Sequence, residues 1–120
     1  MSYKPLVSVI MSVNRDDGKL SQTIDSLLNQ TFINYEIIII NDGKSISVSK
    51  IIKKYKDSRI KYYELEKKGL TACLNYGIKV SRGILIARQD CGDISLPNRL
   101  QTQVDYLNNN KKIKLVGTFI

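Results

Sequence analysis

Apolar runs alternate along this chain with stretches in which apolar residues recur every three or four positions. Residues 36–40 are a glutamate followed by four consecutive β-branched isoleucines, a run that is typical of a strand covered on both sides. Helical spacing separates such runs and marks four segments, which begin near Leu20, Val48, Leu70 and Leu100. The other strand patterns cover residues 6–13, 59–65, 84–87 and 113–116. This order predicts an α/β fold with a mostly parallel sheet flanked by helices on both faces.

Polar residues follow three of the predicted strands, in residues 12–18, 41–45 and 90–95. The carboxyl ends of parallel strands meet at one edge of a sheet, so these loops should line one crevice. The first loop leads into a helix N-terminus, which favours anions. Asp42 can accept hydrogen bonds from a base or a ribose, while Asp90 and Asp93 are oxygen ligands suited to Mg²⁺ or Mn²⁺. Together the loops predict a site for a nucleoside diphosphate.

Each loop also has an ordinary structural interpretation. Residues 41–43, Asn-Asp-Gly, are a common tight turn, and residues 90–95 equally describe a solvated turn. Within the latter, Ser95 is predicted to cap the fourth helix, with Pro97 in its first turn. For residues 41–43, the convergence of the loops at one edge favours the interpretation as a binding site over that as a structural turn.

The composition narrows the chemistry of such a site. The chain has 120 residues, 42% of them hydrophobic and 25% charged, which suits one globular domain. It contains no histidine, so any metal would be held by oxygen atoms. Its two cysteines match no disulfide or metal spacing, and we find no signal peptide or membrane span, so we expect a cytoplasmic protein.

The chain is strongly basic. Nineteen lysines and arginines against 11 acidic residues give a net charge of +8, with the excess in residues 50–68 and 111–114. Such a surface attracts nucleotide phosphates or anionic lipid headgroups, although compositional bias explains the charge as well. We expect no nucleic-acid partner, because the sequence has no recognised motif or aromatic platform for one.

Five blocks of the sequence resemble, in order and with normal spacing, the family 2 glycosyltransferases of GT-A fold. They are VSVIMSV at 7–13, LLNQTFINYEIIIINDG at 27–43, DSRI at 57–60, GLTACLNYGI at 69–78 and ARQDCGDISLPNRLQTQ at 87–103. The resemblance implies the Rossmann-like, nucleotide-binding half of that fold. It also implies inverting transfer of a sugar from a nucleotide-sugar, commonly a UDP-sugar, to a polysaccharide or lipid-linked acceptor. The enzyme would then work in the cytoplasm, peripheral to the inner face of the plasma membrane.

The resemblance also implies roles for individual residues. Asp42 matches the aspartate that holds the uracil or ribose, and residues 12–14 match the loop along the base. Asp90 matches the first aspartate of the Asp-x-Asp element, near the ribose and metal. Arg88 matches an arginine found in many members, with a structural salt bridge as its alternative role. The implied nucleotide-binding set is Ser12, Val13, Asn14, Arg15, Asp42, Lys68, Arg88 and Asp90.

Two departures from the family pattern affect the site. Asn14 and Arg15 stand where an aromatic residue and an asparagine are usual, which puts stacking on the base in doubt. Gly92 stands where the principal metal ligand is usual, so either Asp90 and Asp93 share Mg²⁺ or Mn²⁺, or the metal binds weakly. Alternatively, positive side chains such as Arg15 or Lys68 neutralise the diphosphate in place of a metal.

A third departure is length, since the family's catalytic domains are about twice as long. We therefore expect residues 1–120 to be the nucleotide-sugar-binding half, without the acceptor-binding half or the general base, and inactive alone. No catalytic residue is assigned. The fifth strand would leave an exposed edge, through which a homodimer could form. The alternative is a non-catalytic nucleotide-binding or assembly module, whereas a phosphoacceptor receiver domain is excluded by the positions of the acidic residues.

Overall fold

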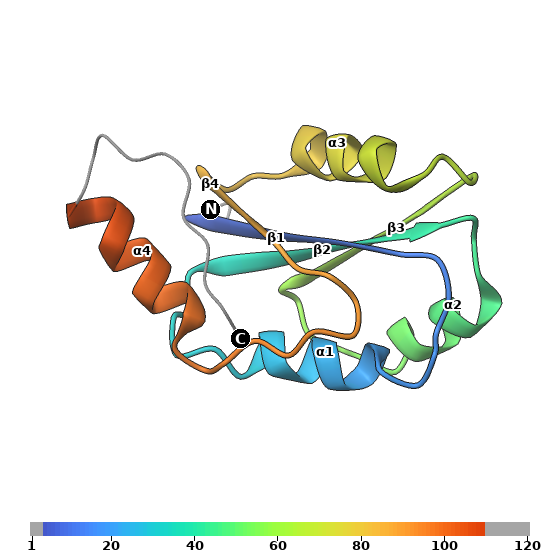
Figure 1. Cartoon of the computed structure of the whole chain (residues 1–120), viewed down its shortest axis with the longest axis horizontal. Helices are drawn as coiled ribbons and strands as arrows, with labels where there is room; N and C mark the ends of the chain where they lie inside the picture. Colours follow the sequence, from blue (N-terminus) through green and yellow to red (C-terminus); the bar gives the residue numbers. More distant parts are fainter. Residues whose placement is uncertain (1–3, 110–120) are drawn as a thin grey trace.

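The computed structural model describes residues 4–109, in which strands and helices alternate as predicted (Figure 1). The predicted fifth strand at 113–116, and the edge it would expose, lie outside these residues. None of the helices within 4–109 is long and apolar enough to cross a membrane. The elements are β1 (Val7–Val13), α1 (Leu20–Leu28), β2 (Tyr35–Asp42), α2 (Ile46–Ile52), β3 (Ile60–Leu65), α3 (Leu70–Val80), β4 (Leu85–Arg88) and α4 (Arg99–Asn109).

The four strands form a parallel sheet in the order β3-β2-β1-β4. Val7 of β1 is in register with Tyr35 of β2 on one side and with Leu85 of β4 on the other. The chain moves outward from β1 to β3 and then returns to the far side of β1. The sheet therefore has its topological switch point between β1 and β4, where open α/β sheets bind ligands.

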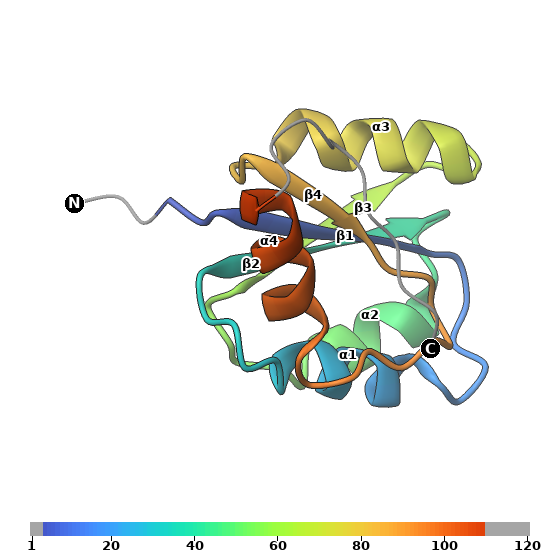
Figure 2. The same ribbon diagram turned by 60° about the vertical axis from the view of Figure 1, so that its left-hand side comes forward.

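Helices cover both faces of the sheet, with α3 on one face and α1 and α2 on the other (Figure 1). Alternate residues of β1, such as Val9 and Met11, are buried in the same core as Leu20 and Ile24 of α1. On the opposite face, Ile10 packs in a second, smaller cluster. Figure 2 shows α4 beside the sheet, and its Leu100 and Val104 belong to the larger core. Because successive side chains of β1 point to opposite faces of the sheet, this strand contributes residues to both hydrophobic cores.

Gly77 lets α3 approach the sheet closely. A Cβ atom at this position would lie 2.5 Å from Cγ2 of Ile10 and 3.1 Å from Cδ1 of Ile40. A larger side chain would therefore push α3 away from the strands.

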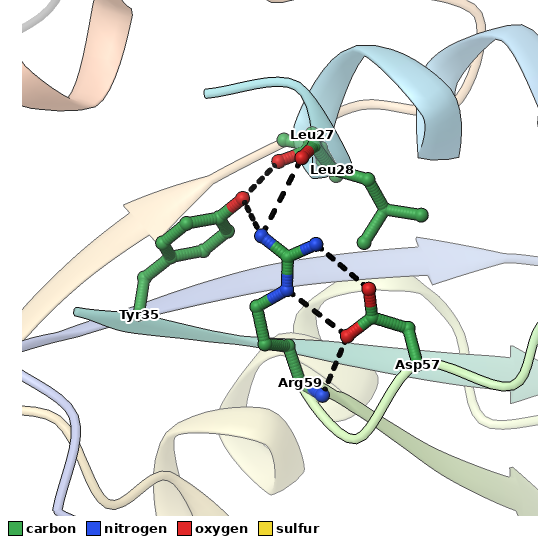
Figure 3. Close-up of polar contacts among 5 residues, drawn as sticks. All are labelled: Leu27, Leu28, Tyr35, Asp57 and Arg59. Atoms are coloured by element: carbon green, nitrogen blue, oxygen red, sulfur yellow. Dashed lines mark hydrogen bonds and ion pairs between the residues drawn. The ribbon is translucent and has the colours of Figure 1, made fainter. Parts of the chain in front are cut away.

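A polar network joins α1 to β2 and β3 at the amino ends of the strands (Figure 3). The Arg59 guanidinium donates to both carboxylate oxygens of Asp57, at 3.0 and 2.7 Å, and to the Tyr35 hydroxyl at 2.7 Å. Tyr35 in turn donates to the carbonyl of Leu27 at 2.6 Å, while Arg59 reaches that of Leu28 at 3.4 Å. A cation near these last carbonyls complements the helix dipole of α1, whose last turn has no basic residue of its own.

A second network at this edge is more deeply buried. The Glu36 side chain is only 2% exposed, and its Oε2 atom accepts hydrogen bonds from the Ser8 hydroxyl (2.6 Å) and the Arg82 backbone N–H (2.7 Å). The Ser8 oxygen also accepts from the Gly83 N–H at 2.8 Å. These bonds fix the connection from α3 to β4 and compensate for burying the carboxylate.

The helix α4 begins later than predicted. It starts at Arg99, and Ser95 and Pro97 both precede it, so the predicted cap at Ser95 is wrong. The Ser95 hydroxyl instead donates to Oε1 of Gln89 at 2.6 Å. The Ser95 side chain therefore bonds to the buried Gln89 and does not cap α4.

Replacing Asp57 by asparagine tests the network of Figure 3. Hydrogen bonding to Arg59 holds the pKa of the Asp57 carboxyl below its ordinary value, so the pair stabilises the fold at neutral pH. This stabilisation is lost as the pH falls through the native pKa. We expect Asp57→Asn to lower the free energy of unfolding by about 1–2 kcal/mol at pH 7, measured by urea denaturation. The difference from wild type should shrink below about pH 4; a constant difference across this range would contradict the prediction.

Candidate functional site

Asp42 ends β2 at the carboxyl edge of the sheet and is only 6% exposed. Its Oδ1 atom accepts the backbone N–H of Lys68 at 2.7 Å, and Oδ2 accepts that of Gly69 at 3.1 Å. Gly69 is the N-cap of α3, has a positive φ of 91°, and provides no side-chain cap. The Asp42 carboxylate therefore binds the two backbone N–H groups that directly precede α3, and it fixes the loop that carries Lys68.

Ser12 and Cys73 lie beside Asp42. Burial raises the pKa of the Cys73 thiol, the Ser12 side chain lowers it, and the Asp42 carboxylate raises it further. These three residues come from β1, β2 and α3, so the carboxyl ends of two strands meet the start of a helix here. Ser12 and Asp42 thus both interact with Cys73 at the carboxyl edge of the sheet.

The loop after β2 is a tight turn, as its Asn-Asp-Gly sequence indicates. Gly43 and Lys44 both have positive φ, and Nδ2 of the buried Asn41 donates to the Ser45 carbonyl at 2.9 Å. Lys44 also forms an exposed ion pair with Glu66 at 2.9 Å. The turn and the binding site are therefore compatible, because Asn41 fixes the turn while Asp42 faces α3.

The turn from Asp90 to Asp93, here called the acidic turn, follows β4. The Asp93 N–H donates to the Asp90 carbonyl at 3.1 Å, and Gly92 between them has a φ of 102°. The Gly92 N–H donates to the Thr23 hydroxyl of α1 at 3.0 Å. The acidic turn is therefore fastened to α1, with both of its aspartates exposed.

Arg88 forms an ion pair with Asp90, with Nε 3.0 Å from Oδ1. The two side chains are 53% and 57% exposed. An ion pair this exposed contributes little to stability, so the Asp90 carboxylate can exchange its partner at low cost.

Arg99, Gln89 and Ser95 form a network behind the acidic turn that the sequence reasoning missed. Nη1 of Arg99 donates to Oε1 of Gln89 at 2.7 Å and to the Ser95 oxygen at 3.0 Å, and Nη2 donates to the Arg88 carbonyl at 2.8 Å. Burial lowers the pKa of the Arg99 guanidinium, while Asp90 and Asp93 raise it. No local sequence signal marks this network, since its members lie up to ten residues apart along the chain.

The loop after β1 lies next to the acidic turn. Burial raises the pKa of the Cys91 thiol, and the carboxylates of Asp17 and Asp16 raise it further. Asp16 accepts the Gly18 N–H at 2.9 Å, which stabilises this loop. Asn14 and Arg15 are exposed, whereas Val13 is buried in the core and offers only its backbone to a ligand.

The predicted residues thus fall into two groups at one edge. Ser12, Asp42 and Lys68 lie around β2 and α3, while Asp90 and Asp93 lie between β4 and α1. The central strand β1 separates them. Within residues 4–109, no hydrogen bond or ion pair links Asp42 to the acidic turn.

The acidic turn suits a metal shared with a second ligand. The described residues contain no group of three acidic, cysteine or histidine side chains that could hold a metal ion. Asp90 and Asp93 nevertheless offer oxygen ligands, and Mg²⁺ commonly binds one or two carboxylates together with substrate phosphates. The donor set therefore fits a cation that arrives with a diphosphate.

Comparison with known proteins identifies the family. The model for "Glycosyl transferase family 2" matches residues 8–120. The chain belongs to this family. It is 42% identical over 118 residues to the O-antigen biosynthesis glycosyltransferase WbnJ of Escherichia coli, and 36% identical over 122 residues to the putative glycosyltransferase EpsE of Bacillus subtilis. The alignments cover 96% and 98% of this chain but 46% and 44% of those relatives, so the chain spans about half their length.

Solved structures confirm the predicted fold class. S. aureus TarS 1–349, in complex with UDP-GlcNAc, matches 88% of this chain with a TM-score of 0.81 and 20% identity. The Pyrobaculum calidifontis mannosyltransferase PcManGT, in complex with GDP-Man and Mn²⁺, matches 88% with a TM-score of 0.74 and 18% identity. The chain covers 32% and 33% of these proteins.

Replacing Gln89 by glutamate tests the support of the acidic turn. The buried Gln89 amide donates from Nε2 to the carbonyls of Asp90 (3.2 Å) and Asp93 (3.0 Å). A carboxylate cannot donate there, so we expect Gln89→Glu to lower the free energy of unfolding by about 2–4 kcal/mol in urea denaturation. The control Gln22→Glu, on the exposed face of α1, should change it by less than about 0.5 kcal/mol. Equal effects of the two variants would contradict this role.

Proposed function

We propose that this chain is the donor-binding part of a glycosyltransferase that uses a nucleotide-sugar, with a UDP-sugar as the donor. Family membership supports sugar transfer. Among the structural neighbours, TarS was crystallised with UDP and UDP-GlcNAc, and PcManGT with GDP-Man. The relative WbnJ, named for O-antigen biosynthesis, supports a polysaccharide or lipid-linked glycan as the product.

The placement of two carboxylate groups on either side of the switch point is the observation that carries the proposal. Asp42 ends β2 and Asp90 follows β4, with β1 between them. Neighbouring strands lie about 4.8 Å apart, so β2 and β4, on either side of β1, are separated by roughly 10 Å across the sheet. The nucleoside would then lie at Asp42, and the diphosphate would extend across the end of β1 toward the acidic turn.

Asp42 retains capacity to bind the nucleoside. An ionised carboxylate has about four acceptor positions, and the N–H groups of Lys68 and Gly69 take two. The others would accept a base imide or a ribose hydroxyl. Residues 12–14 end β1 beside this carboxylate and would lie along the base.

At the acidic turn, Asp90 and Asp93 would hold a divalent cation together with the diphosphate. The cation would supply electrostatic stabilisation to the departing nucleoside diphosphate. Arg88 would give up its exposed ion pair with Asp90 as the cation binds, and would then be free to approach a phosphate. Arg15, which is exposed on the neighbouring loop, and Lys68 are further cationic groups for the diphosphate.

Acceptor binding and the general base belong, in this proposal, to the part of the relatives' length that this chain does not match. Exposed lysines at the end of α2 would let the larger protein approach an anionic membrane that carries lipid-linked acceptors. They are Lys50, Lys53, Lys54 and Lys56, and they form no ion pair within residues 4–109.

Calorimetric titration with UDP, GDP and ADP, each with Mn²⁺ and with EDTA, tests the proposed function. We expect selective binding of UDP that Mn²⁺ strengthens. Selective binding in EDTA with no effect of Mn²⁺ would support the base site but assign the diphosphate to cationic side chains. Absence of UDP binding by the folded chain would overturn the proposal.

A pair of aspartate variants tests the placement of the nucleoside. We expect Asp42→Ala to weaken UDP binding by about tenfold or more, because it removes hydrogen bonds to a charged acceptor. Asp16→Ala, which removes a carboxylate that accepts the Gly18 N–H, should change the affinity much less. Circular dichroism would verify that α3 remains folded without the Asp42 carboxylate. Equal losses in the two variants would show that the nucleoside binds elsewhere.

A further inference from the structure

Arg99 is a partly buried cation whose described hydrogen bonds go to neutral acceptors. Its guanidinium donates to the Gln89 amide, the Ser95 hydroxyl and the Arg88 carbonyl. Within residues 4–109 it forms no ion pair, although Asp90 and Asp93 are near enough to influence its pKa. Arg88 is the arginine that contacts the Asp90 carboxylate directly. Arg99 therefore reaches the acidic turn through other groups.

Gln89 transmits the influence of Arg99. Its Oε1 atom accepts from both Arg99 (2.7 Å) and Ser95 (2.6 Å), while its Nε2 atom donates to the carbonyls of Asp90 and Asp93. All four hydrogen-bonding positions of this amide are thus occupied. The two donors at Oε1 fix the orientation of the amide, and that orientation presents Nε2 to both ends of the acidic turn.

Arg99 also fixes the strand that leads into the turn. Its bond to the Arg88 carbonyl, at 2.8 Å, ties the first residue of α4 to the last residue of β4. On the other side of the acidic turn, Ser95 is fixed to α1, because its N–H donates to the Ser26 hydroxyl at 3.0 Å. One guanidinium therefore connects the residues that precede and follow the acidic turn.

We propose that Arg99 is a positioning residue for cation and diphosphate binding, and that it holds the acidic turn through Gln89, Ser95 and the Arg88 carbonyl so that Asp90 and Asp93 bind one divalent ion. This inference rests on the proposed function. Two carboxylates supply fewer ligand atoms than three, so the affinity for the cation depends on the position of each of them. Groups that orient metal ligands typically change metal affinity by about 10–100-fold when removed.

The test measures the metal enhancement, defined as the UDP dissociation constant in EDTA divided by that in Mn²⁺. We expect Arg99→Met to reduce this ratio by about tenfold and to leave UDP binding in EDTA within about twofold. Arg59→Met is the matched control, because Arg59 also bridges a strand, a helix carbonyl and a hydroxyl, but at the opposite edge. It should lower the melting temperature and leave the enhancement unchanged.

Arg99→Lys provides a milder variant if Arg99→Met does not fold. A single ammonium group preserves the charge but cannot reproduce the forked contacts, so we expect an intermediate enhancement. Full enhancement in folded Arg99→Met, or in Arg99→Lys where only that variant folds, would overturn the inference. An equal loss in Arg59→Met would also overturn it, because the effect would then follow stability.

The wild-type chain separates the inference from the proposed function. UDP binding that is indifferent to Mn²⁺ would overturn the inference and leave nucleotide-sugar binding standing. Absence of UDP binding by the folded wild type would overturn both.

Discussion

The central position of β1 is the constraint on which the rest of this structure depends. Its backbone pairs with β2 on one side and β4 on the other, and its side chains supply both cores. Because all the strands are parallel, the loops after β1, β2 and β4 end at one edge. The separation of Asp42 from Asp90 is consequently a property of the sheet order, and backbone hydrogen bonds maintain it.

The two edges of the sheet satisfy their charges differently. At the amino edge, Glu36 is buried and bonded to Ser8 and a backbone N–H, and Arg59 is bonded to Asp57 and Tyr35. At the carboxyl edge, Asp42 is buried and bonded to two backbone N–H groups, but the carboxylates of Asp90 and Asp93 are exposed. Charges whose partners are fixed by the fold stabilise it, whereas exposed charges remain available to a ligand.

The sequence was sufficient to predict the four strands within residues 4–109, the order of the elements there and the carboxylates at the edge, because each follows from a local pattern. The apolar run in residues 36–40, for example, predicted a buried strand, and β2 is buried along its whole length. The role of Ser95 was mispredicted because its hydroxyl donates to the buried Gln89 and does not cap the helix. No sequence pattern indicated the role of Arg99, since that role depends on how α4 packs beside β4. Local chemistry is visible in the sequence, while hydrogen bonds between elements require the fold.

The glycine within the acidic turn limits the number of carboxylates that the turn can offer to a cation. Gly92 adopts a positive φ and supplies a backbone N–H to Thr23, so it shapes the turn while contributing no carboxylate. A cation on two exposed carboxylates must complete its coordination with water or phosphate oxygens. If the site binds a nucleotide-sugar as proposed, cation and nucleotide affinities are linked, and each raises the other by the same factor. With two carboxylates as its protein ligands, metal binding would then depend strongly on the donor.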